Sequence, residues 1–150
     1  MTMKKISMWL LCVFLLSQCH KKMYSLENLP KEFIEMGSYG GFAGTATKYF
    51  FFPNGQRFLS NGIAGGSQNA TSNEIEKAQP KDFKNMLKGL KALNFCNLEL
   101  NEVGNMTYFI KLKNKKEEKL VQWNNMDTAP AALVSFFREQ LQSIPKAPIN

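Results

Sequence analysis

Residues 45–60 read TATKYFFFPNGQRFLS, and this stretch predicts a β-hairpin. Its first part is rich in β-branched and aromatic residues, PNG at 53–55 is a turn signal, and residues 56–60 continue as the partner strand. In the first strand Phe50 shares a face with Ala46, whereas Tyr49 and Phe51 point to the opposite face. Because both faces carry apolar side chains, we expect one to meet a helix and the other a partner or another strand.

The segments around the hairpin predict further strands and two helices. Residues 32–38 are expected to form a first strand, residues 106–113 alternate as a half-buried strand does, and residues 119–124 return after a charged turn. Residues 80–93 and 130–144 repeat apolar side chains at helical spacing, each opening with a proline. The order β-β-β-α-β-β-α predicts an α+β fold, with an antiparallel sheet of four to five strands covered on one face by two helices. We expect Trp123 to pack against a helix and to bond its indole N–H to backbone or water.

Two stretches are rich in glycine. Residues 61–73 are too polar and glycine-rich for a regular element, so they predict a flexible loop. Residues 39–44 read YGGFAG, whose glycines either shape a tight turn, the favoured interpretation, or let this edge approach a partner's backbone closely. The candidate partner-binding residues are Tyr39, Gly40, Gly41, Phe42 and Gly44, with Phe42 or Tyr39 as the apolar anchor.

The first nineteen residues predict an export signal. Lys4 and Lys5 precede an apolar stretch at 6–16 that is shorter than the roughly 20 residues of a membrane-spanning helix. The run LSQC at 16–19 resembles a bacterial lipobox, which implies cleavage before Cys19 and a diacylglyceryl group on its sulfur. An ordinary secretory peptide with an incidental cysteine and an uncleaved anchor are the alternatives.

Cleavage at that point divides the chain into a signal peptide at 1–18, a lipidated tether at 19–31 and a single domain at 32–146. The lipid would anchor the mature chain to a membrane. An aspartate just after the lipidated cysteine retains some lipoproteins in the inner membrane. This chain has Lys21 there and no aspartate, so we expect the outer membrane of a bacterial envelope in preference to the inner one.

The charge pattern argues against nucleic acid. The formal net charge of +7 falls to +5 (7 − 2) when Lys4 and Lys5 leave with the signal. The lysines are scattered among acids and the only arginines are Arg57 and Arg138, so we expect no nucleic-acid partner. The four lysines of the predicted first helix, at 81, 84, 88 and 91, are expected to face water rather than a membrane.

The inventory of reactive side chains points away from catalysis. The only histidine, His20, lies beside the lipidation position, so the folded part lacks the usual general base and zinc ligand. Of three cysteines only Cys96 remains in the domain, where its apolar neighbours predict a small buried residue. We therefore expect no enzyme activity, no metal site and no cofactor.

Several features in sequence order together resemble emfourin, a bacterial protein inhibitor of thermolysin-like metalloproteases. They are the glycine run at 40–44, LKALNF at 90–95, the strand pair around Tyr108 and Val121, and PAAL at 130–133. The likeness covers residues 33–144 and implies a protein-binding lipoprotein whose partner is a secreted or envelope protease. The lipid signal and the glycine-rich stretch after Phe58 depart from the family pattern. The alternative is a structural or accessory lipoprotein of a cell-envelope complex without inhibitory activity.

Overall fold

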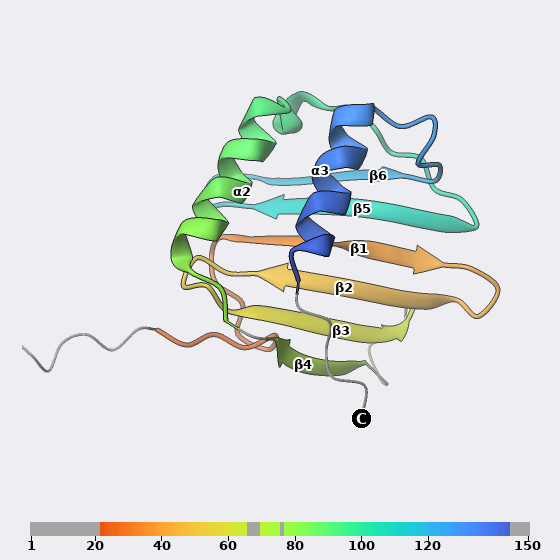
Figure 1. Ribbon diagram of the computed structural model, residues 1–150. Coiled ribbons are helices and arrows are strands. Elements are labelled where there is room, and N and C mark those ends of the chain that lie inside the picture. Colours follow the sequence, from red (N-terminus) through yellow and green to blue (C-terminus); the bar gives the residue numbers. More distant parts are fainter. Residues whose placement is uncertain (1–21, 66–69, 76, 145–150) are drawn as a thin grey trace, which may run out of the picture.

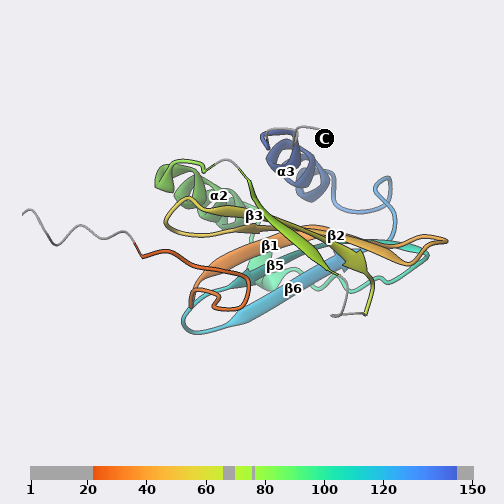
Figure 2. The same cartoon turned by 90° about the horizontal axis from the view of Figure 1, so that it is seen from below.

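Two helices cover one face of an antiparallel sheet (Figures 1 and 2). The computed structural model describes residues 22–65, 70–75 and 77–144. In order, the elements are β1 (Phe33–Gly40), β2 (Thr45–Phe51), β3 (Arg57–Ile63), β4 (Thr71–Ile75), α2 (Pro80–Ala92), the 3₁₀ helix η1 (Phe95–Asn97), β5 (Met106–Lys113), β6 (Glu118–Trp123) and α3 (Ala131–Gln142). The predicted α+β class, with an antiparallel sheet and two helices, is confirmed.

The sheet is wider than the sequence predicts. Its six strands within the described residues lie in the order β4-β3-β2-β1-β5-β6. The prediction of a loop over residues 61–73 is wrong at both ends, because β3 continues to Ile63 and residues 71–75 return beside it as β4. Residues 66–69, in the middle of the predicted loop, lie outside the described residues. The strand order along the chain is therefore β-β-β-β-α-β-β-α.

The core lies between the sheet and the helices, on the face that carries Tyr49 and Phe51 (Figure 2). Burial of these side chains supplies roughly 25 cal/mol for each Å² of apolar surface removed from water. From the sheet, the fully buried residues include Ile34, Met36, Ile110, Val121 and Trp123; the buried helix residues are Phe83, Met86, Leu90, Leu133, Val134 and Phe137.

Trp123 joins the sheet to α3. Its ring lies edge-on to Phe137, with 5.2 Å between the ring centroids, and stacks on Tyr108 at 6.2 Å. The expected packing against a helix is confirmed. The indole N–H donates to the sulfur of Met126 at 3.4 Å. Its acceptor is therefore a side chain, and not the backbone or water that the sequence predicts.

Residues 22–32, which we call the arm, lie against the domain (Figure 1). The backbone N–H of Tyr24 donates to Oε1 of Gln56 at 2.8 Å, and the Tyr24 ring meets Phe52 edge-on with 5.8 Å between centroids. Nδ2 of Asn54 donates to the carbonyl of Lys22 at 2.7 Å. Because Gln56 is only 1% exposed, these contacts fasten the arm to a buried group. The segment predicted as a tether is thus bound to the domain from Lys22 onward.

Candidate functional site

At one end of the sheet three loops expose apolar side chains. The turn between β1 and β2 is tied to the loop before β5 through Gly41, whose N–H donates to the Asn105 carbonyl. It is tied to the end of β3 through the N–H of Ala64, which donates to the Gly44 carbonyl at 2.6 Å. One large apolar residue on each of these three segments is more than half exposed. These residues, Phe42, Ile63 and Val103, define what we call the apolar end.

The glycines of the predicted site shape the β1–β2 turn. Gly40, Gly41 and Gly44 have φ values of 113°, 74° and 59°, which non-glycine residues rarely adopt. The N–H of Gly44 donates to the Gly41 carbonyl at 3.0 Å and closes the turn. Phe42 stands fully exposed at its tip. The turn interpretation of the glycine run therefore fits the geometry, and the turn presents Phe42 to solvent.

Tyr39 is partly buried on the sheet, in contrast to the fully exposed Phe42. Its ring lies 6.0 Å from that of Phe109, and its hydroxyl donates to Oε1 of Gln122 at 3.0 Å. These contacts build Tyr39 into the helix-free face of the sheet. The structure thus brings Gly40, Gly41, Phe42 and Gly44 together and gives Tyr39 a packing role, while Cys19 lies outside the described residues.

Two substitutions in the turn test this role of the glycines. Gly40→Ala would place a Cβ 2.1 Å from the backbone oxygen of Asn105, whereas the Cβ of Gly44→Ala meets nothing within 4 Å. We expect Gly40→Ala to lower the free energy of unfolding by about 2 kcal/mol or more, and Gly44→Ala by about 1 kcal/mol from the positive φ alone. Urea unfolding of both variants measures the difference. Equal losses would show that the Asn105 contact does not constrain the turn.

Sequence reasoning missed Ile63 and Val103. Ile63 lies in the stretch predicted as a loop, and Val103 is a lone apolar residue in a polar connection before β5. An isolated apolar side chain in a polar segment is a weak signal. Only the strand register places them at one end of the sheet, because it pairs Thr45 with Ile63 and Gly40 with Met106.

A groove of about 780 Å³ runs along the helix-free face of the sheet, between the arm and the β3–β4 hairpin. The groove has apolar surface from Leu26 of the arm and from Phe50. Lys48 also lines it and lies 3.6 Å from its ion-pair partner Glu35. Ile63 of the apolar end also borders the groove, so the groove reaches that end of the sheet. The second apolar face of the hairpin therefore meets the arm and this groove.

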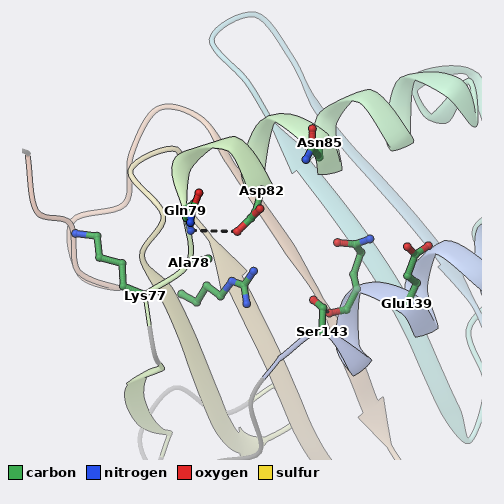
Figure 3. Close-up of a pocket in the computed structure, with 9 residues that line it drawn as sticks. Lys77, Ala78, Gln79, Asp82, Asn85, Glu139 and Ser143 are labelled. Carbon is green, nitrogen blue, oxygen red and sulfur yellow. Dashed lines mark hydrogen bonds between the residues drawn. The ribbon is translucent and has the colours of Figure 1, made fainter.

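A polar hollow of about 510 Å³ lies between the start of α2 and the end of α3 (Figure 3). It contains Arg57 and the carboxylates of Asp82 and Glu139. The Asp82 carboxylate already accepts the backbone N–H of Gln79 at 3.1 Å and so caps α2. Since cations and carboxylates offset one another, the hollow has no strong preference for ligand charge.

Cys96 is exposed, so the prediction of a buried residue is wrong. Asn94 adopts a left-handed conformation after α2, and in the turn that follows Phe95 is buried while Cys96 faces solvent. Partial desolvation and the hydrogen bond to Glu117 raise the pKa of the Cys96 thiol, which keeps it protonated at neutral pH.

Neither a metal-binding cluster nor a membrane span is found in the part of the chain that the structure describes. There, no three residues of the types His, Cys, Asp and Glu gather closely enough to hold a metal ion. No helix in the same ranges has the length and apolar character to cross a bilayer.

Comparison with known proteins leaves the family open. No family model matches the chain, and no curated protein matches it. The resemblance to emfourin stays a prediction that rests on the residues quoted above.

Proposed function

We propose that this chain is a lipid-anchored protein of a bacterial envelope that binds another protein through its apolar end. The observation that carries the proposal is Phe42, fully exposed at the tip of a glycine turn, at the same end of the sheet as Ile63 and Val103. An aromatic ring in water gains nothing for the isolated domain, whereas in a partner's pocket it is a typical binding anchor. The turn also fixes the backbone on either side of Phe42, which lowers the backbone entropy lost on binding.

As the specific partner we propose a thermolysin-like metalloprotease, in line with the resemblance to emfourin. A protruding turn with an apolar tip has a shape that can enter a substrate cleft. Such an inhibitor performs no chemistry and acts by occupying the cleft. The alternative, an accessory lipoprotein of an envelope complex, would use the same apolar end on a partner that is not a protease.

Phe42→Ala tests the proposed anchor. Because the side chain is fully exposed, we expect the free energy of unfolding to change by less than about 0.5 kcal/mol. Loss of a central aromatic anchor is expected to weaken binding by at least about tenfold. The measurement is the activity of a thermolysin-type protease, titrated with the chain produced without residues 1–19.

Leu120→Ala is the matched control, because Leu120 is exposed on β6 and does not belong to the apolar end. It should leave inhibition unchanged. Stoichiometric loss of protease activity with the unmodified sequence supports the inhibitor. No inhibition at large excess removes it and leaves the accessory role, for which Phe42-dependent crosslinking to an envelope protein is the readout.

A further inference from the structure

We propose that the domain rests one particular end against the anionic headgroups of its membrane, so that the apolar end points away from the bilayer. This arm end comprises residues 22–24, the β2–β3 turn at 53–55, the start of α2 at 77–81 and the β5–β6 turn at 114–117. The inference rests on the lipid anchor at Cys19 in the proposed function. It adds an orientation and a second contact surface that lipidation alone does not provide.

The bound arm fixes where the lipid can lie. The carbonyl of Lys22 is held by Asn54, and both backbone polar groups of Tyr24 are bonded to the side chain of Gln56. Cys19 precedes Lys22 by three residues, so its Cα lies no further than about 11 Å from that of Lys22 even in an extended chain. If the arm were not bound to the domain, the chain from Cys19 to the start of β1 could extend about 45 Å. The bound arm therefore limits the lipidated position to within about 11 Å of Lys22 at the arm end.

The opposite end of the sheet is well separated from this point. The turn that contains Asn54 follows β2, and the turn that contains Phe42 precedes it (Figure 1). The eight residues of β1 span about 23 Å between the two ends. The reach from Lys22 to Cys19 is too short to bring the lipid to the apolar end.

The two ends also differ in charge. At the apolar end, residues 38–46, 60–65, 70–73, 101–107 and 122–130 include Glu102 and Asp127 but no lysine or arginine. At the arm end as defined above there are five basic side chains, Lys22, Lys77, Lys81, Lys115 and Lys116, and one acidic side chain, Glu117. Anionic headgroups attract cations mainly within a Debye length of about 8 Å. The end nearest the lipid is thus the end whose charge complements the membrane surface.

Individual side chains at the arm end suit a membrane interface. Met23 is more than half exposed, and the Lys77 ammonium lies 3.9 Å from its sulfur. The Lys22 ammonium lies 5.5 Å from the centre of the Tyr24 ring. Apolar and aromatic groups beside lysines can enter the interfacial layer while the ammonium groups meet phosphate.

Fluorescence quenching by lipid headgroups tests the orientation. The lipidated protein, carrying Cys96→Ser to remove the exposed thiol, is placed in phosphatidylethanolamine–phosphatidylglycerol vesicles with a headgroup-linked nitroxide. A fluorophore is attached to Lys115→Cys at the arm end or to Ala43→Cys at the apolar end, both exposed positions. We expect quenching at position 115 to exceed that at position 43 by about threefold or more, because a headgroup nitroxide quenches only at short range and β1 separates the two ends by about 23 Å. Equal or reversed quenching overturns the orientation.

Two matched charge variants test the headgroup contact. Lys77→Gln with Lys81→Gln removes two charges from the arm end, whereas Lys48→Gln with Arg138→Gln removes two from outside it, on β2 and α3. The first pair should reduce the quenching ratio by about half in anionic vesicles and the second should leave it unchanged. Equal effects, including none from either pair, overturn the headgroup contact. The intact mass is measured first: an unmodified chain overturns the anchor and the orientation together, while an acylated chain with equal quenching overturns the orientation alone.

Discussion

Trp123→Ala is expected to destabilise the domain by about 3–5 kcal/mol, the usual loss for a large buried aromatic residue. Trp123 is fully buried between Tyr108 of the sheet and Phe137 of α3. Its removal leaves a cavity at the contact between the two layers and strips Met126 of its N–H donor. Since domains of this size are stable by about 5–15 kcal/mol, the loss is a large fraction of the total. Urea unfolding followed by circular dichroism measures it.

Leu120→Ala is a close control on the same strand. Leu120 lies three residues before Trp123 but is 45% exposed, so the change should cost less than about 0.5 kcal/mol. Trp123→Phe keeps an aromatic ring in the site and should fall between the two. Similar unfolding midpoints for Trp123→Ala and Leu120→Ala would contradict the proposed role of Trp123 in joining the layers.

Cys19→Ser is expected to abolish acylation completely. Without the thiol no thioether to the diacylglyceryl group can form, so the chain should also keep residues 1–18. The protein with Cys19 should begin at that residue and carry the mass of two or three acyl chains, which together give a stable anchor where one gives only marginal binding. Intact mass spectrometry of protein from the membrane fraction measures both properties.

Cys96→Ser is the matched control, because it removes the other cysteine outside the signal and should leave processing and acyl mass unchanged. Two outcomes for the unaltered protein contradict the lipid anchor. An unacylated start near residue 19 would indicate an ordinary secretory peptide. An intact chain from Met1 without acyl mass would indicate an uncleaved anchor.

Elements whose apolar residues recur at regular spacing could be predicted from the sequence, whereas the edge strand β4 could not. Residues 106–113 alternate apolar and polar side chains, and β5 has these bounds. α2 agrees with the predicted helix over 80–93 to within one residue. β4 reads TSNEI and is almost wholly exposed, because it lies at the edge of the sheet and no helix covers it. A strand that buries nothing shows no period, so its pairing with β3 leaves no trace in the sequence.

The candidate site, too, could be predicted from the sequence only in part. The glycines at 40, 41 and 44 signalled a turn because positive φ selects glycine. Ile63, Val103 and the docking of Tyr24 on Gln56 depend on long-range contacts, which local patterns do not encode. Cys96 was misplaced because the left-handed backbone at Asn94 changes the direction of the chain one residue before Phe95.

Under the proposed lipid anchor, the docked arm limits the distance between Phe42 and the membrane surface. With the lipid at Cys19, the maximum distance from Cys19 to Lys22 and the length of β1 together place the β1–β2 turn about 35 Å or less from the attachment point. A partner that shares the membrane is then met by lateral diffusion in a thin layer, which raises its effective concentration above that in the whole compartment. On the proposed anchor, a partner whose binding surface lies farther from the membrane is out of reach, so the arm would restrict the possible partners by distance as well as by shape.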